Sequence, residues 1–188
     1  MAMLKAPLAP RDRRRGDPDA PVVLVEYGDF QCPYCAAAEP VVNSLLQAYG
    51  HDTQLVFRHF PLTQVHPLAE PAAEAAEFAD DHGAFWPMHE ALFANQPRLS
   101  LPVIFAIAGA MNLPQSELRD ALEAGTYARK VRNDFVGGAR SGVNGTPCFF
   151  INGERHDGGF SFEDLSAAIL AARAAAVGPQ PNRPLHAG

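Results

Sequence analysis

The sequence contains few cysteines, a small share of basic residues and no long apolar run. Three cysteines among 188 residues are too few for the disulfide scaffold of a small secreted protein. Acidic residues outnumber basic ones by 21 to 15, and the net charge of −6 excludes the basic surface of a general nucleic-acid-binding protein. The apolar stretches fall far short of the ~20 residues of a transmembrane helix. Hydrophobic residues nevertheless make up 47% of the chain, enough for the core of one globular domain.

The first 20 residues show no secretion signal. Such a signal needs an apolar run of about 7–15 residues after a basic start, and here Pro7, Pro10 and charged residues interrupt the segment. We therefore expect a cytoplasmic protein, with a processed periplasmic form or a fragment of a longer protein as the open alternative. Arg11 and the run Arg13–Arg15 form a basic cluster that nearby aspartates dilute, and we interpret it as part of a solvated tail.

The most informative motif is Cys-Pro-Tyr-Cys at residues 32–35, between a predicted strand over residues 22–27 and a predicted helix over residues 33–49. Unpaired N–H groups and the macrodipole at a helix N-terminus stabilise an anion. A thiol there therefore loses its proton more readily than a free thiol. Residues i and i+3 share a helix face, so the two cysteines can form a disulfide. We expect Cys32, at the cap, to be the exposed nucleophile and Cys35, one turn inside, to be the buried resolving thiol.

A zinc site is the alternative interpretation of two cysteines at this spacing. Zinc needs two further ligands, and the remaining cysteine, Cys148, lies far along the chain without a partner at short spacing. A redox-active dithiol is therefore favoured, and no metal is expected. We interpret Cys148 as a buried, inert thiol, with a redox role as the open alternative.

The order of hydrophobic patterns predicts an α/β domain with a helical insertion. The first strand, the helix that carries the cysteines and a second strand over residues 54–59 predict a parallel pair with a right-handed crossover. Apolar residues then recur at helical spacing from residue 68 to residue 142. Strand character returns at residues 148–151, a hairpin turn follows at Asn152-Gly153, and a final helix begins near Ser161. The predicted parts are a flexible N-terminal tail (1–19), an α/β domain (20–63 and 143–178), a helical insertion (64–142) and a flexible C-terminal tail (179–188).

Two segments, EYGDFQCPYC at residues 26–35 and SGVNGTPCFFING at residues 141–153, resemble the DsbA-like branch of the thioredoxin superfamily. The order of the predicted elements between about residues 18 and 177 resembles that family as well. The resemblance implies an α/β, thioredoxin-like fold with an inserted all-helical domain. It also implies the activity of a protein disulfide oxidoreductase without a bound cofactor, in which the Cys32–Cys35 disulfide is itself the redox group.

The resemblance further implies where a substrate binds. In the family, the proline that matches Pro147 is cis and faces the dithiol, and X–Pro is the one linkage for which the cis isomer costs little. The backbone of Thr146 would then be free to pair with an extended partner peptide beside the thiols. Pro33 and Tyr34, between the two cysteines, complete the predicted substrate-binding residues.

Glu26 is a carboxylate in an otherwise apolar strand, and a buried acid is costly unless it is paired or protonated. Because the family keeps an acid at the matching position under the active-site helix, we predict that Glu26 accepts a proton from Cys35 during resolution. A residue at the strand end that reaches water is the open alternative. We expect His59 and His66 to be surface or turn histidines.

Three functions fit this predicted site. The first is an enzyme, a thiol–disulfide oxidoreductase that acts on protein or peptide thiols and disulfides, with a glutathione or thioredoxin-type electron donor. The second is a redox-sensing regulatory domain of the type fused to sodium/proton antiporters, in which the disulfide state alters binding. The third is a thioredoxin-fold isomerase that uses glutathione, against which Cys35 argues because such relatives usually lack the second cysteine. We expect no nucleic-acid partner and no membrane span.

Overall fold

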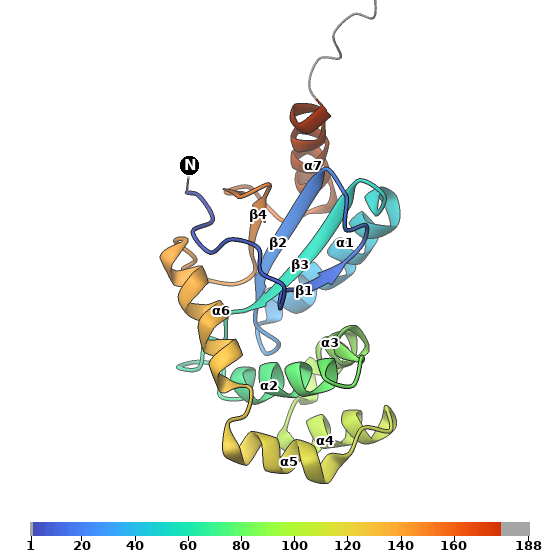
Figure 1. Cartoon of the computed structure of the whole chain (residues 1–188), viewed down its shortest axis with the longest axis vertical. Helices are drawn as coiled ribbons and strands as arrows, with labels where there is room; N and C mark the ends of the chain where they lie inside the picture. The colour runs from blue at the N-terminus through green and yellow to red at the C-terminus, as the bar shows by residue number, and fades with distance from the viewer. Residues whose placement is uncertain (1, 178–188) are drawn as a thin grey trace, which may run out of the picture.

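The structure is a computed structural model that describes residues 2–177 (Figure 1). Its centre is a five-stranded sheet in the order β1-β3-β2-β4-β5. β2 and β3 run parallel, and the other neighbouring strands are antiparallel. The predicted C-terminal tail (179–188) lies outside the described residues. The strands span Arg13–Arg15 (β1), Val22–Gly28 (β2), Thr53–His59 (β3), Cys148–Ile151 (β4) and Glu154–Arg155 (β5).

Helices cover both faces of this sheet, which explains why its two central strands are apolar on both sides. On one face, α1 (Pro33–Tyr49) and α7 (Phe162–Val177) share a buried cluster with β2 and β3. On the other face, α6 (Ala128–Arg140) packs against β3, with the rings of Phe60 and Phe135 stacked 4.4 Å apart. The predicted strand–helix–strand unit is confirmed, with boundaries shifted by at most one residue.

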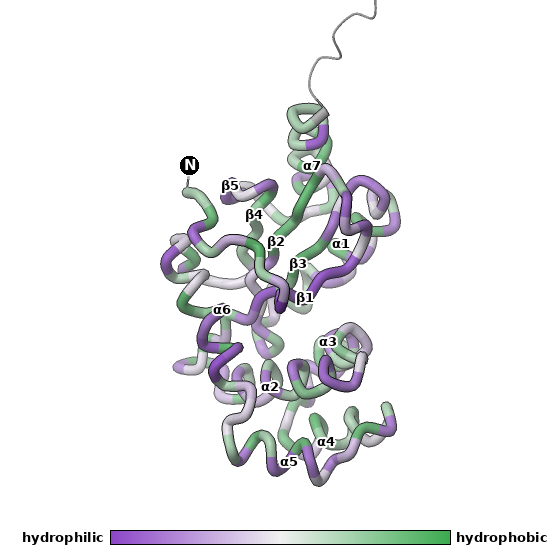
Figure 2. Tube along the Cα trace, viewed as in Figure 1, coloured by the Kyte–Doolittle hydropathy of each residue, from purple (hydrophilic) through white to green (hydrophobic). Residues whose placement is uncertain are grey.

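The segment between β3 and β4 is helical, as predicted, and its first helices lie below the sheet in Figure 1. Its core is continuous with the region around the cysteines, because Cys32 and Cys35 belong to the same buried cluster as Met88 and Leu92 of α3 and Phe57 of β3. Figure 2 shows hydrophobic residues along β2 and hydrophilic ones along β1. None of the described helices is both long and apolar enough to cross a membrane. The helices of this segment are α2 (Ala69–Asp80), α3 (Phe85–Ala94), α4 (Leu101–Ala110), α5 (Gln115–Ala124) and α6, with a 3-10 turn over Gln96–Arg98.

Residues 2–19 are not a flexible tail, which corrects the prediction made from the basic cluster. They form an extended segment, here called the N-terminal strap, that runs from the β4–β5 hairpin along the sheet to the helical segment (Figure 1). The N–H of Leu4 donates to the carbonyl of Gly153 at 2.8 Å, and β1 pairs with β3. The indole of Trp86 donates to the carbonyl of Arg14 at 2.9 Å. The basic cluster suggested a solvated tail because these partners lie far away in the sequence.

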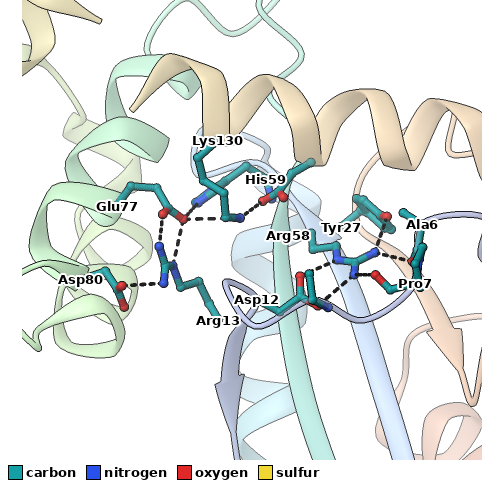
Figure 3. Close-up of polar contacts among 12 residues, drawn as sticks. Ala6, Pro7, Asp12, Arg13, Tyr27, Arg58, His59, Glu77, Asp80 and Lys130 are labelled. Atoms are coloured by element: carbon teal, nitrogen blue, oxygen red, sulfur yellow. Dashed lines mark hydrogen bonds and ion pairs between the residues drawn. The ribbon is translucent and has the colours of Figure 1, made fainter. Parts of the chain in front are cut away.

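One buried arginine anchors the middle of the strap (Figure 3). Arg58 of β3 is 3% exposed and donates to both carboxylate oxygens of Asp12 at 2.9 Å. Its remaining N–H groups donate to the backbone carbonyls of Ala6 and Pro7 and to the hydroxyl of Tyr27. The guanidinium therefore has a full set of acceptors, and three of its four partners belong to the strap.

A second group of charges joins the strap to the helical segment (Figure 3). Arg13 donates to the carboxylate of Glu77 on α2 and forms an ion pair with Asp80 at 2.5 Å. The Nε2 atom of His59 lies 2.8 Å from the same Glu77 carboxylate, and the Nζ atom of Lys130 lies 3.8 Å from it. His59 is 1% exposed, so the prediction of a surface histidine is wrong for this residue. We call the Arg58 and Glu77 groups together the strap network.

The β4–β5 turn is the hairpin that Asn152-Gly153 predicts. Asn152 has a φ of 47° and Gly153 a φ of 86°, so both residues lie in the left-handed region that a type I′ turn requires. In the register of β4 on β2, Cys148 lies opposite Tyr27. The residues just before Cys148 therefore lie beside the end of β2, where the chain enters the turn that carries the cysteines.

Candidate functional site

The two cysteines begin a helix directly after a buried strand. β2 ends at Gly28, and Cys32 is the N-cap of α1, with extended backbone angles (φ −74°, ψ 121°). The N–H of Cys32 donates to the carbonyl of Asp29 at 3.1 Å, and the carbonyl of Cys32 accepts the N–H of Ala36 at 3.2 Å. Both cysteines are free thiols in this structure. The turn thus fixes the backbone on either side of the first sulfur.

Cys32 is less exposed than predicted. Only 3% of the residue is exposed, because it lies against the loop before β4 and against the helical segment. Its Sγ atom is 3.3 Å from the carbonyl oxygen of Thr146, and the Thr146–Pro147 peptide bond is cis. The side-chain amide of Gln96 donates to the Cys32 carbonyl at 2.6 Å. The structure therefore brings together the predicted nucleophile and the predicted peptide-binding backbone.

The Cys32 thiol is strongly acidified. A hydrogen bond from the Cys35 thiol lowers the pKa of Cys32 to about 5, against the opposing effect of burial. Thr146 and the backbone N–H groups of Tyr34 and Cys35 lower the pKa further. The lowered pKa agrees with the sequence prediction, but its largest cause is the second cysteine rather than the helix terminus. At neutral pH, the sulfur of Cys32 is a thiolate.

Cys35 has the opposite character. It is fully buried (0% exposed), and burial raises its pKa, with a further rise from the hydrogen bond to Cys32 and from the charge of Glu26. The backbone N–H of Asp29 donates to its Sγ atom at 3.4 Å and acts in the other direction. The two thiols of the motif are therefore strongly unequal, one ionised and one protonated.

Glu26 lies on β2 and is 1% exposed, so it is not a strand-end residue that reaches water. Its Oε2 atom has no hydrogen-bond partner among the described residues. Burial raises the pKa of Glu26 to about 8, with a smaller contribution from the charge of Glu39. The side chain therefore carries a proton at neutral pH and can exchange it close to that pH.

The Phe57 ring of β3 lies near this carboxyl group. Glu26 pairs in register with Phe57, and a Cβ atom at Gly28 would lie 2.4 Å from the Phe57 ring and 3.5 Å from Oε1 of Glu26. The ring of His89, from α3, lies 4.6 Å from that of Phe57. His89 is 1% exposed, and neither ring nitrogen has a hydrogen-bond partner among residues 2–177. Burial lowers the pKa of His89 to about 3, so the imidazole is neutral. Nothing in the sequence marks His89, which occupies a position of α3 that usually holds an apolar residue.

Asp29 is a second residue that sequence analysis missed. Its side chain is fully buried, and Oδ1 accepts the N–H of Gln31 at 2.7 Å. Oδ2 accepts the N–H of Leu62 at 2.9 Å and lies 2.8 Å from Nδ1 of His66. An aspartate that bonds the N–H two residues later forms an Asx turn, and its place three residues before the first cysteine was the available signal. His66 therefore lies next to the dithiol turn, with its side chain 19% exposed.

The remaining predicted residues divide into two groups. Pro33 and Tyr34 are exposed beside Cys32, and Tyr34 is 65% exposed, so both are accessible to a partner. Cys148 is 6% exposed and belongs to a different buried cluster from Cys32 and Cys35. In residues 2–177, no group of three or more His, Cys, Asp or Glu side chains is arranged to hold a metal ion.

Sequence comparisons connect the chain with a known family. A family model described as Thioredoxin matches residues 8–171. The "Na(+)/H(+) antiporter NhaA 1" of Salinispora arenicola is 46% identical over 170 residues, which cover 90% of this chain and 26% of the relative. The "Na(+)/H(+) antiporter NhaA 1" of Mycobacterium sp. strain KMS is 39% identical over 165 residues, 87% of this chain and 27% of the relative. The chain thus spans about a quarter of the length of the curated relatives it matches.

Structural comparisons give the same fold. BdbD from Bacillus subtilis superimposes with a TM-score of 0.81 at 22% identity, over 92% of this chain and 98% of that one. The alpha-DsbA1 of Wolbachia pipientis has a TM-score of 0.80 at 23% identity, over 93% and 96%. A thioredoxin-like oxidoreductase from Silicibacter pomeroyi has a TM-score of 0.76 at 27% identity, over 88% and 94%.

Proposed function

The chain belongs to the thioredoxin family and has the fold of DsbA-like proteins, and on that premise we propose that it is a thiol–disulfide oxidoreductase that exchanges disulfides with protein substrates. The observation that carries the proposal is the inequality of the two thiols. The pKa of Cys32 is lowered to about 5, whereas burial raises that of Cys35. One sulfur is therefore ready to attack at neutral pH, and the other is held in reserve.

The first step is attack of the Cys32 thiolate on a disulfide of the partner. A new S–S bond forms between Cys32 and one partner sulfur, the partner's own S–S bond breaks, and the second partner sulfur leaves as a thiolate that takes up a proton. The backbone of Thr146, next to the Cys32 sulfur, pairs with the extended chain of the partner. Exposed Pro33 and Tyr34 provide contacts beside the attacked bond.

Resolution follows from the change in charge. Once Cys32 is in the mixed disulfide, its negative charge no longer raises the pKa of Cys35. Cys35 then gives its proton to the ionised form of Glu26, which is a minor fraction at neutral pH because the pKa of Glu26 is raised to about 8, close to that of a free thiol. The Cys35 thiolate attacks Cys32, the bond to the partner breaks, and the partner leaves reduced while the Cys32–Cys35 disulfide forms.

The redox group of this proposal is the dithiol, without a further cofactor. A glutathione or thioredoxin-type donor would return the Cys32–Cys35 disulfide to the thiols. A cytoplasmic location, which stays a prediction from the sequence, would favour reduction or isomerisation of partners. For oxidation of a partner, the same exchange steps occur in the reverse order. A partner thiolate then attacks Cys32 of the Cys32–Cys35 disulfide, and Cys35 leaves as the thiolate.

A second candidate is a redox-sensing domain whose disulfide state alters binding. It is favoured by the relatives named as Na(+)/H(+) antiporters, of which this chain matches about a quarter. In such a domain, Cys32 and Cys35 would cycle between thiol and disulfide without turning over a protein substrate. Turnover therefore separates the two candidates.

The test is reduction of insulin disulfides with a thiol reductant as electron source, alongside single substitutions in the motif. We expect turnover by the wild-type protein, complete loss in Cys32→Ser, and accumulation of a mixed disulfide at Cys32 in Cys35→Ser. Cys148→Ser is the matched control and should keep the wild-type rate, because Cys148 lies in another cluster. Full turnover by Cys35→Ser would contradict the resolving role, and a wild-type protein that cycles its disulfide without turnover would favour the sensor.

A further inference from the structure

The loop between β3 and α2 is tied to the dithiol turn at several points. The N–H of Phe60 donates to the carbonyl of Gly28 at 2.8 Å, at the end of β2. The N–H of Leu62 donates to the buried Asp29 carboxylate at 2.9 Å. The N–H of Leu68 donates to the side-chain carbonyl of Gln31 at 2.7 Å. The start of the helical segment is therefore held against the residues that precede Cys32.

Asp29 is the centre of these contacts and touches both cysteines through its backbone. Its carbonyl accepts the N–H of Cys32 at 3.1 Å, and its N–H donates to the sulfur of Cys35 at 3.4 Å. The side chain accepts from Gln31, Leu62 and His66. A carboxylate only accepts hydrogen bonds, so the proton between His66 and Asp29 lies on Nδ1 of the imidazole.

We propose that Asp29 and His66 form a positioning pair that holds the backbone N–H of Asp29 on the sulfur of Cys35 and so stabilises the Cys35 thiolate whenever it forms. The inference deepens the proposed function and rests on it, because it concerns the resolving step. In that step, Cys35 transfers its proton and attacks Cys32. Negative charge then develops on a fully buried sulfur, where a fixed N–H donor has its largest effect.

His66 is the part of the pair that can be changed without opening the core. Its side chain is 19% exposed, whereas that of Asp29 is fully buried. Loss of the imidazole leaves Asp29 with its bonds to Gln31 and Leu62, so the turn should persist with a less firmly held N–H. The same donor serves both directions of exchange, because Cys35 is the attacking thiolate in one and the leaving thiolate in the other.

The experiment follows the reduced protein with dithiobis(nitrobenzoate), an aromatic disulfide that releases a coloured thiol. Attack by Cys32 releases the first coloured thiol and leaves a mixed disulfide; attack by Cys35 releases the second. In His66→Ala we expect the second phase to slow by about 3- to 10-fold and the first by less than about twofold, as weakening one hydrogen bond to a charged group implies. The pH midpoint of the second phase should also move upward.

Further variants separate positioning from a general loss of structure. His66→Gln keeps a side-chain donor and should recover most of the second-phase rate. Asp29→Asn should slow that phase at least as much as His66→Ala; if it does not fold, His66→Ala decides alone. His82→Ala is the matched control, because the hydrogen bond of the His82 ring within residues 2–177 is to the carbonyl of Phe78, on the helix that ends just before His82.

Each remaining outcome overturns one specific statement. The proposal that Asp29 and His66 form a positioning pair is overturned if folded His66→Ala shows an unchanged second phase. It is also overturned if both phases slow equally and the melting temperature falls. The proposed function is overturned instead if the wild-type protein shows no second phase. It is also overturned if Cys32→Ser still shows the first phase. The two failures are therefore distinguishable in one set of traces.

Discussion

The molecule contains two buried polar regions of opposite construction, the dithiol site and the strap network. In the strap network, the charged groups are paired: Arg58 with Asp12, and Glu77 with Arg13 and His59. In the dithiol site, Glu26 and His89 are buried as deeply, but Oε2 of Glu26 and both ring nitrogens of His89 have no hydrogen-bond partner in the part of the chain that the structure describes. The comparison shows that depth of burial does not decide what a charged residue does; the presence or absence of partners does.

The pKa values express the same difference. Against the effect of burial, hydrogen bonds from His59 and Arg13 hold the pKa of Glu77 at about 2. Burial without such bonds raises the pKa of Glu26 to about 8. Glu77 therefore keeps one charge state across the range of ordinary solution conditions, whereas Glu26 changes its state close to neutral pH. The first region holds segments together, and the second is able to move protons.

Glu26→Gln should produce the largest change of stability. Because the folded state holds a proton on Glu26 that the unfolded chain releases above about pH 4.3, wild-type stability from this group is greatest below that pH and falls as pH rises toward 8. The loss amounts to about 5 kcal/mol over that interval. The variant should lack this decline, as measured by urea unfolding at several pH values. Parallel curves for the two proteins would contradict the raised pKa.

Arg58→Leu should destabilise the protein by about 4 kcal/mol, because it leaves the Asp12 carboxylate buried without its partner. Urea unfolding measures the loss. Adding Asp12→Asn to Arg58→Leu removes the unpaired charge and should recover part of the stability. The thiolate absorbance of Cys32, followed against pH, should be unchanged. A shift of that curve would show that the two regions are coupled.

Glu77→Gln tests the strap network at acidic pH. The lowered pKa means that Glu77 contributes stability above about pH 4.3 that is lost as pH falls through 2, an effect of about 3 kcal/mol. The variant should be less stable than wild type at neutral pH, with the difference closing in acid. The stability difference between wild type and Glu77→Gln should therefore grow as pH rises, whereas the contribution of the Glu26 side chain to stability falls. The same direction for both residues would contradict the contrast between the two regions.

Arg15→Ala should have the smallest effect. Arg15 and Glu90 form an ion pair at 2.7 Å, but their side chains are 41% and 47% exposed. Exposed pairs contribute about 0–1 kcal/mol, so the unfolding midpoint should scarcely move. A larger loss would show that the exposed end of the strap contributes as much as its buried middle.

The sequence predicted those parts of the molecule in which the signal is local. The alternation of apolar residues, the proline at the start of α1 and the Asn152-Gly153 turn each act within a few residues, and the corresponding elements were placed correctly. The strap was missed because its order depends on pairs such as Arg13 with Glu77, 64 residues apart in the sequence. A run of arginines gives no indication of distant acceptors.

The candidate site was predicted in the same uneven way. The cysteines, Glu26 and the loop at Thr146 were found from motifs, and the structure brings them together. The buried state of Cys32 was missed because it depends on Gln96 and on the Thr146 loop folding over the sulfur. The lowered pKa of Cys32 was expected from the helix terminus, whereas its largest cause is the hydrogen bond from the Cys35 thiol. The raised pKa of Cys35 comes first from burial, which its place one turn inside the helix predicts.

Gly28 shows how narrowly this arrangement limits sequence change. A side chain at position 28 would collide with the Phe57 ring. Position 28 therefore accepts no residue other than glycine while the ring keeps its place. Random mutagenesis followed by selection for activity should therefore recover glycine at this site unless position 57 changes in the same clone. Gly28 and Phe57 are therefore expected to change together, so evolution of this part of the site requires paired substitutions.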